Sequence, residues 1–468
     1  MDFSDIAPKA NFTHPGLNLC PLIDLSTGHV HKGKHGEMLC SGGLRYTSGI
    51  GGMSNMGKST KAHFLLTKAL GNYRMANGLA ADFEIPSITP TRMADIYRSA
   101  NFEDGEPVID SGRLWMTDGS VITGDELWGR TVTGLSNKIK KENLKANTMT
   151  LPFIDPKTGA HLTTIVPSIS EYDSFSLFTI EKIENVLEEN NPGDKETLIT
   201  AMTASGAKAQ IVQRMGSYPA RVGGYWIMTA HVDKEIVTDT RAIPIKKLTY
   251  LQNGLGLKHV PRNWPFMMNT LWYVCNTKTM AHKDSKEPFY PSAGEREEGD
   301  TDLMESKFLT LRSKGGPAGW SYDFLFSQRK GVLMPLTEFH YLKNEAEGFG
   351  IGGNRDHWFM DLYDSVKMQR TTVRDKLDED PMLRRAVELT IELSLLKKFH
   401  SHVIDPSLFC DPKTLLEDLT KMGYDRDEIL STTRSFWQPL EYDHEKKYLH
   451  AADLLNIRAG TYKPYWMQ

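Results

Sequence analysis

The sequence predicts an α/β protein with a mostly parallel, twisted sheet covered by helices on both faces, followed by a helical C-terminal region. Three observations lead to this prediction. A glycine-rich loop stands between a strand-like run and an apolar run at helical spacing, and a second strand-like run follows. Two more buried strands are expected at 224–232 and 271–276. Beyond residue 350 the pattern changes to long stretches with helical spacing, at 381–399 and 412–430.

Composition and charge limit the classes of function. The chain has 468 residues, of which 40% are hydrophobic and 24% charged, which is the balance of a globular protein with one large core and a smaller one. No apolar run approaches the ~20 residues of a membrane helix, and the N-terminus lacks the pattern of a secretory signal. The net charge of −4 means that any nucleic-acid site must be local.

The four cysteines are Cys20, Cys40, Cys275 and Cys410. None of them forms a CxxC pair, which argues against a zinc ribbon and against a disulfide framework. We therefore expect a reducing, cytoplasmic environment.

The first segments of the chain predict a βαβ unit. Residues 12–60 alternate short apolar runs with glycines, which is typical of strands that lead into a turn. Residues 61–75 carry apolar side chains at helical spacing, and Leu79 to Phe83 form a short apolar run that ends on acids. A strand, a loop, a helix and another strand in this order favour a parallel sheet.

The later segments predict further elements. Residues 149–166 resemble a hairpin that turns at 155–159, and residues 195–220 are helix-like. The polar stretch 284–302 reads as a surface insertion, and residues 307–314 and 321–328 as antiparallel edge strands. We place a domain boundary near residue 350, between a core at 1–350 and a helical domain at 351–468.

The glycine-rich loop has the spacing of a phosphate-binding P-loop. Its residues are Gly52, Met53, Ser54, Asn55, Met56, Gly57, Lys58, Ser59 and Thr60. Glycines let backbone N–H groups close around phosphate oxygens, Lys58 supplies a charge for the β- and γ-phosphates, and Ser59 offers a hydroxyl ligand to Mg²⁺. The following helix directs its positive end at the same phosphates. The loop therefore predicts binding of ATP and Mg²⁺, and the alternative is a chance surface loop.

Three polar residues at strand ends complete the candidate site. Glu84 follows the strand after the P-loop helix, where a carboxylate can orient the water that attacks the γ-phosphorus; the alternative is a solvated acid. Asp173 and Asp155 are both candidates for the acid that holds Mg²⁺, and we choose Asp173 because Asp155 precedes a Pro-Lys-Thr-Gly turn. His231 ends the strand 224–232, where it could sense the γ-phosphate or be a structural histidine.

Two basic loops are candidates for binding nucleic acid, because cations neutralise phosphates and aromatic rings stack on bases. Tyr250 and Trp264 are interleaved with the cations of the second loop. The alternative is a pair of solvated loops. The candidate residues are Lys208, Arg214, Arg221, Arg241, Lys246, Lys247, Lys258 and Arg262.

The order of these motifs resembles the RecA superfamily of DNA recombinases, and most closely its phage branch of UvsX type. The resemblance covers about residues 12–345: the glycine-rich approach to the P-loop, ADFEIPSITPTRM with Glu84, SEYDSFS with Asp173, and YWIMTAH with His231. It implies a RecA-like P-loop NTPase core. LRSK resembles the basic motif that reaches a neighbouring subunit's ATP, which nominates Arg312 and Lys314.

The resemblance implies a DNA-dependent ATPase with Glu84, Lys58 and His231 as catalytic residues. Its expected partners are single-stranded DNA, duplex DNA in pairing reactions, and further copies of the chain in a filament or ring. The expected work is homologous pairing and strand exchange in phage recombination, replication and repair. For a phage protein, the expected location is the cytoplasm of the host cell. Two alternatives stay open: a ring-forming RecA-fold helicase or annealing ATPase, and a regulatory ATPase that ignores DNA.

Overall fold

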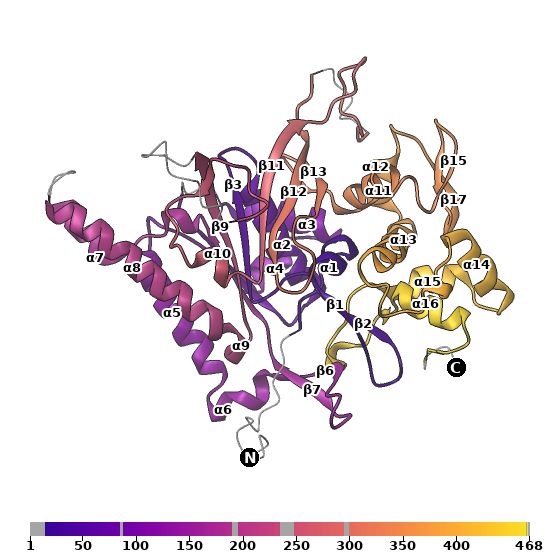
Figure 1. The fold of residues 1–468 in the computed structure, drawn as a ribbon, viewed down its shortest axis with the longest axis horizontal. Helices are drawn as coiled ribbons and strands as arrows, with labels where there is room; N and C mark the ends of the chain where they lie inside the picture. The colour runs from indigo at the N-terminus through magenta and orange to yellow at the C-terminus, as the bar shows by residue number, and fades with distance from the viewer. Residues whose placement is uncertain are drawn as a thin grey trace.

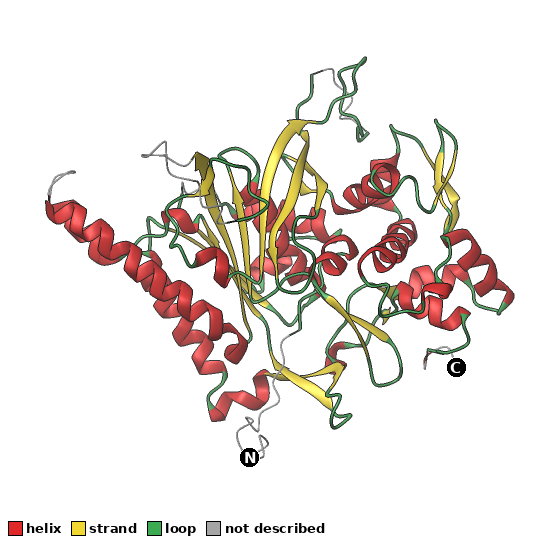
Figure 2. Cartoon of the chain, in the orientation of Figure 1, coloured by secondary structure: helices red, strands yellow, loops and turns green. Residues whose placement is uncertain are grey.

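The chain folds around one large central sheet that is flanked by helices (Figures 1 and 2). A computed structural model describes residues 15–84, 88–189, 195–234, 248–293, 299–464 and residue 466. The sheet has ten strands in the order β14-β13-β12-β11-β3-β9-β8-β4-β5, and β10 pairs with β9 beside this path. In the described part of the chain, no helix is long and apolar enough to cross a membrane.

Most of this sheet is parallel. The parallel strands are β11 (Thr270–Thr279), β3 (Thr47–Gly52), β9 (Gly224–Lys234), β8 (Ser168–Asp173), β4 (Asn77–Asp82) and β5 (Leu114–Asp118). The antiparallel strands are β12 (Leu303–Ser313), β13 (Ser321–Ser327), β14 (Gly331–Val332) and β10 (Leu255–Leu257). The prediction of an α/β protein with a mostly parallel sheet is confirmed.

Helices cover both faces of the sheet. On one face, Phe64 of α2 (Lys58–Asn72) and Met93 of α3 (Pro90–Asn101) share a buried cluster with Ile227 of β9. On the other face, Trp128 of α5 (Gly124–Lys138) shares a second cluster with Met228, the next residue of β9. Successive side chains of a strand point to opposite faces, so a continuous apolar run in β9 supplies both cores.

The expected βαβ unit and hairpin are present. Strand β3 leads through the glycine-rich loop into α2 and then to β4. Strands β6 (Thr148–Ile154) and β7 (His161–Ile165) pair antiparallel, and the turn closes through a hydrogen bond of 2.8 Å from the Gly159 N–H to the Asp155 carbonyl. The Asp155 carboxylate accepts from the Lys157 N–H at 2.8 Å. The turn interpretation of Asp155 is confirmed.

The remaining helices lie beside the sheet or beyond it. They are α1 (Pro21–Thr27), α4 (Glu106–Asp110), α6 (Lys141–Leu144), α7 (Glu181–Glu189), α8 (Lys195–Ser217), α9 (Pro219–Val222), α10 (Trp264–Met267), α11 (Met334–Asn344), α12 (Val373–Glu379), α13 (Pro381–Phe399), α14 (Pro412–Lys421), α15 (Arg426–Thr432) and α16 (Ala451–Arg458). Small sheets join β1 (His29–Lys32) to β2 (Met38–Ser41), β15 (Ile351–Gly353) to β16 (Trp358–Met360) and β17 (Tyr363–Met368), and β18 (Thr433–Arg434) to β19 (Lys447–Tyr448).

Two differences from the sequence-based expectation concern the sheet domain. The segment 12–60 contains the buried helix α1, which begins at Pro21 and is too short to show helical spacing. Strand β12 was expected at an edge, yet it lies between β11 and β13, and the two-residue β14 forms that edge. The insertion at 284–302 is partly outside the described residues.

The C-terminal region packs against the sheet domain. One buried cluster includes Phe324 of β13, Phe339 of α11 and Leu389 of α13. The His400 ring contacts the Leu25 carbonyl of α1 through Nε2 at 2.7 Å. The domain boundary near residue 350 stays a prediction, because apolar contacts continue across it.

Candidate functional site

The candidate residues at the strand ends meet at one edge of the sheet. In the pairing register, Asp82 of β4 stands opposite Asp173 of β8, and Gly52 of β3 stands opposite His231 of β9. All four strands are parallel and neighbouring, so their carboxyl ends form one edge. Ligands of open α/β sheets bind at this edge.

The glycine-rich loop lies at this edge, where it joins β3 to α2. Asn55 and Gly57 have φ angles of 61° and 73°, in the left-handed region, and these turns redirect the chain into α2. A Cβ at Gly52 would lie 3.0 Å from the Lys58 Cγ. The absence of a side chain at Gly52 therefore leaves room for the Lys58 side chain beside β3. Ser54 and Asn55 are exposed, while Ser59 and Thr60 begin α2 half-buried.

Lys58 is held in a buried, electrostatically defined position. Its Nζ donates to the Met53 carbonyl at 2.9 Å, within the loop itself. Burial lowers the pKa of Lys58, while the carboxylates of Asp173 and Glu84 oppose this shift. The ammonium group therefore lies near both the loop and two acids. Burial deprives it of water, and an anionic ligand would compensate its charge.

Glu84 and His231 come together although 147 residues separate them in the sequence. The His231 Nε2 lies 3.7 Å from a Glu84 carboxylate oxygen, and the Glu84 N–H donates to Asp82 at 2.9 Å. Burial, followed by the nearby Lys58 charge, lowers the pKa of His231 and favours its neutral ring at neutral pH. The Glu84 side chain is 40% exposed, so water reaches it.

Asp173 is the last residue of β8, a strand that pairs with β9 and contacts α2. It is buried, and it accepts a hydrogen bond from the Thr229 hydroxyl. Asp155 lies in the hairpin turn described above and outside the central sheet. The choice of Asp173 over Asp155 as the Mg²⁺ ligand stays a prediction. The position of Asp173 at the edge of the central sheet favours it.

Ser176 is a residue that the sequence did not single out. Its hydroxyl accepts from the His231 N–H at 2.9 Å and donates to the Lys258 carbonyl at 2.9 Å. Its own carbonyl accepts from the Lys208 ammonium at 3.1 Å. Ser176 thus connects the tip of β9 to both basic segments, and no spacing in the sequence marks that role.

The structure brings some of the predicted DNA-binding residues together and separates others. The Lys208 ammonium and the backbone carbonyl of Lys258 both contact Ser176, and burial lowers the pKa of Lys208 to about 8. Arg214 and Arg262 are exposed. Arg221 lies on α9, which precedes β9 and therefore stands at the opposite edge of the sheet. Arg241, Lys246 and Lys247 lie outside the described residues.

Arg312 and Lys314 also lie at the opposite edge of the sheet from the P-loop. Arg312 pairs with Leu271 at the beginning of β11, and that strand runs parallel to β3. Its guanidinium lies 5.7 Å from the ring centre of Phe266, and Lys314 is exposed. Within one chain these cations are therefore remote from the glycine-rich loop.

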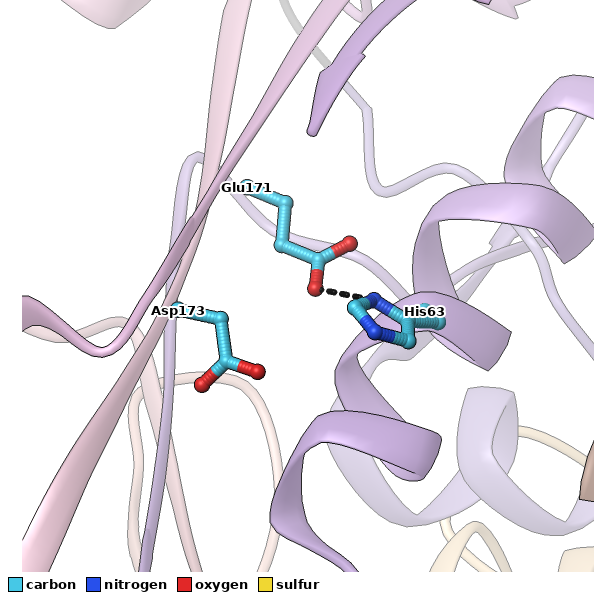
Figure 3. A group of neighbouring side chains, drawn as sticks. All are labelled: His63, Glu171 and Asp173. Carbon is cyan, nitrogen blue, oxygen red and sulfur yellow. Dashed lines mark hydrogen bonds and ion pairs between the residues drawn. The ribbon is translucent and has the colours of Figure 1, made fainter. Parts of the chain in front are cut away.

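A buried histidine and glutamate lie beside Asp173 and were also missed by the sequence analysis (Figure 3). The Nδ1 of His63, on α2, lies 2.6 Å from Oε1 of Glu171, on β8. Although burial would lower it, the adjacent Glu171 carboxylate raises the pKa of His63. Burial raises the pKa of Glu171. Glu171, Asp173 and His63 are each at most 7% exposed.

No family model matches the chain. No curated protein matches its sequence. The family expectation therefore depends on the motifs and on the geometry of this edge.

Proposed function

We propose that this chain is a RecA-type DNA recombinase that hydrolyses ATP at the carboxyl edge of its sheet. One observation carries the proposal: the P-loop lysine, two acids and a histidine, predicted separately from four segments, belong to one edge, and His231 lies 3.7 Å from Glu84. Unrelated surface residues from four segments are not expected to lie together at the beginning of α2.

The residues present fit a nucleotide with its metal ion. The left-handed turns at Asn55 and Gly57 open a loop of backbone at the start of a fifteen-residue helix, which suits phosphate oxygens. Ser59 and Asp173 would hold Mg²⁺, which neutralises charge on the phosphates when it is bound. Lys58 would bind the β- and γ-phosphates, and Glu84 would orient the attacking water.

Arg312 and Lys314 would complete the site of a neighbouring copy, since they lie at the far edge of their own sheet. Such a head-to-tail contact generates a filament or a ring. Single-stranded DNA would bind near Lys208 and Lys258, and Ser176 would connect that region to His231. In this proposal, ATP-bound copies hold DNA for homologous pairing, and hydrolysis releases it.

A DNA-independent regulatory ATPase is the second candidate, and two observations favour it. Lys208 donates inward to the Ser176 carbonyl, and Arg221 stands at the opposite edge of the sheet. These two candidate DNA-binding side chains thus do not face one common surface.

The test is ATP hydrolysis by the full chain with and without single-stranded DNA, over a salt series. A recombinase would show stimulation by DNA that falls steeply as salt rises, because phosphate contacts release counterions. Lys58→Ala is the control and is expected to abolish hydrolysis. Hydrolysis that depends on Lys58 but ignores DNA would support the regulatory ATPase instead.

A further inference from the structure

A cavity of about 460 Å³ lies between the sheet domain and the helices that follow it. We propose that this cavity binds a small organic phosphate of about the size of a nucleoside monophosphate. One wall is formed by the C-terminal ends of α2 and α3, and the other by α11, α13 and the segment 433–446. Ligand-binding cavities in proteins have volumes of roughly 300–1,000 Å³. The site lies apart from the glycine-rich loop, because Lys68 follows Lys58 by about 15 Å along α2.

The lining of this cavity carries more positive than negative charge. Six lysine and arginine side chains line it, against four glutamates. One of these glutamates, Glu338, is only 2% exposed, and burial, followed by the nearby Glu388 carboxylate, raises the pKa of Glu338 well above its usual range. Glu338 therefore carries negative charge less readily than a glutamate in water does. The excess of cations favours an anionic ligand.

Two of the lining cations, Lys68 and Arg384, form no ion pair within the described part of the chain. The Lys68 ammonium donates to the Ala100 carbonyl at 3.1 Å, which leaves two of its three N–H groups for a ligand. The Arg384 guanidinium donates only to backbone carbonyls, each at 2.8 Å, and it lies 3.8 Å from the ring centre of Phe102. Burial lowers the pKa of Arg384. A bound anion would supply the counter-charge that both side chains lack.

The buried part of the lining includes a polar group without a partner. One carboxyl oxygen of Glu338, Oε1, accepts from the Leu22 N–H at 3.2 Å. The other oxygen, Oε2, has no hydrogen-bond partner among the described residues, although Glu338 lines the cavity and is almost fully buried. Buried polar atoms are normally hydrogen-bonded. A protonated carboxyl group can donate to a phosphate oxygen, so a bound phosphate would satisfy it.

The size of the cavity and its aromatic lining determine the class of anion. An inorganic phosphate ion would leave most of the cavity empty. The rings of Phe102, Phe436 and Tyr442 also line it, and aromatic rings offer surfaces on which a nucleobase stacks. Guanidinium groups suit phosphate in particular, because their N–H groups match the spacing of two phosphate oxygens. A phosphate monoester with a planar group therefore fits both parts of the lining.

The experiment titrates the full-length chain by isothermal titration calorimetry, with AMP and CMP as probes and citrate as a carboxylate anion for comparison. We expect one AMP or CMP per chain and much weaker binding of citrate. Lys68→Gln and Arg384→Gln should each weaken nucleotide binding about 10–100-fold, because each removes charge-assisted hydrogen bonds. Lys397→Gln, which changes an exposed lysine of α13 outside the cavity, is the matched control and should bind as the unmodified chain does.

Lys58→Ala separates this site from the glycine-rich loop, because it should lose ATP and still bind AMP or CMP as the unmodified chain does. Loss of AMP and CMP binding in Lys58→Ala would assign these nucleotides to the loop and overturn the proposal. Absence of binding by the unmodified chain, or unchanged binding by Lys68→Gln and Arg384→Gln, would also overturn it. Citrate binding as tight as nucleotide binding would overturn the assignment to a phosphate. If one cavity variant fails to fold by circular dichroism, the other decides the question.

Discussion

At the scale of single residues, the candidate site combines charge with restricted hydration. Burial lowers the pKa of both Lys58 and His231, so each side chain carries positive charge less readily than it does in water. Glu84 and Asp173 oppose these shifts from the same edge. A phosphate group that enters between them would therefore change the hydrogen bonds of several residues together.

His231 is expected to transmit the state of the nucleotide to the basic segments. Its ring faces Glu84, while its backbone N–H binds Ser176, which contacts both Lys208 and Lys258. We predict that His231→Ala hydrolyses ATP at the DNA-free rate whether or not DNA is present. His231→Gln keeps a polar side chain at the strand end and should retain the response. A steady-state assay with and without single-stranded DNA measures both, and an alanine variant that responds like the unmodified chain refutes the role.

Residues at strand ends could be predicted from the sequence, and residues in cross-sheet contacts could not. Glu84, Asp173 and His231 each stand at or next to the end of a strand-like run, and parallel strands bring such positions to a common edge. His63 and Glu171 are separated by 108 positions, and their contact depends on how α2 is rotated against β8. No periodic pattern in the sequence indicates how α2 is rotated. Ser176 was missed for the same reason.

At the scale of elements, the long helices α2 and α13 were predicted from the sequence, but the fifteen-residue α5 was not, and the stretch 412–430 forms two helices, α14 and α15, instead of one. The apolar spacing in α2 and α13 extends over several turns, whereas α1 has seven residues and all of them are buried. Tertiary contacts stabilise so short a helix: the Leu22 N–H donates to Glu338 at 3.2 Å. Strands β15 to β17 also interrupt the largely helical region beyond residue 350. They were not predicted from the sequence, because each contains only three to six residues.

The packing of α13 against α16 predicts a pH-dependent stability. Glu392 accepts from the Ala451 N–H at 2.6 Å and lies 3.6 Å from Arg385, and burial raises its pKa to about 8. Between its ordinary pKa and about 8, the folded state keeps this proton and the unfolded state loses it. Stability should therefore fall as pH rises through this window. Burial raises the pKa of Asp453 to about 8 as well, which adds to the fall.

Glu392→Gln keeps an acceptor for the Ala451 N–H and does not titrate. We predict that its free energy of unfolding falls less than that of the unmodified chain between pH 5 and pH 8, by an amount on the order of a few kcal/mol. Urea unfolding at a series of pH values measures the difference. Glu388→Gln, one turn earlier on α13 with 30% of the side chain exposed, is the control. Parallel pH profiles for the unmodified chain and Glu392→Gln would contradict the prediction.

At the scale of the whole molecule, the candidate residues lie at two opposite edges of the sheet. The glycine-rich loop, Glu84 and His231 occupy the carboxyl edge, whereas Arg312 and Lys314 stand at the other. This separation was not visible in the sequence, because the order of segments does not tell at which end of the sheet a residue lies. In the proposed function, a complete site would therefore depend on two copies of the chain.

Mixing of two inactive variants tests that dependence. Glu84→Gln damages the P-loop edge, and the double variant Arg312→Ala with Lys314→Ala damages the opposite edge. In an equal mixture, about a quarter of head-to-tail interfaces would combine two intact edges. We predict that the mixture hydrolyses ATP although each variant alone does not. A mixture as inactive as its components would exclude shared sites.

The central claim is that ATP binds at the carboxyl edge and that Glu84 acts on the attacking water. The most direct measurement compares nucleotide binding, by fluorescent ATP titration, with hydrolysis in the unmodified chain, Lys58→Ala and Glu84→Gln. Lys58→Ala is expected to lose both binding and hydrolysis. Glu84→Gln is expected to bind ATP like the unmodified chain and to hydrolyse it about 10²–10⁴ times more slowly. Hydrolysis at the unmodified rate by either variant would rule out these roles of Lys58 and Glu84.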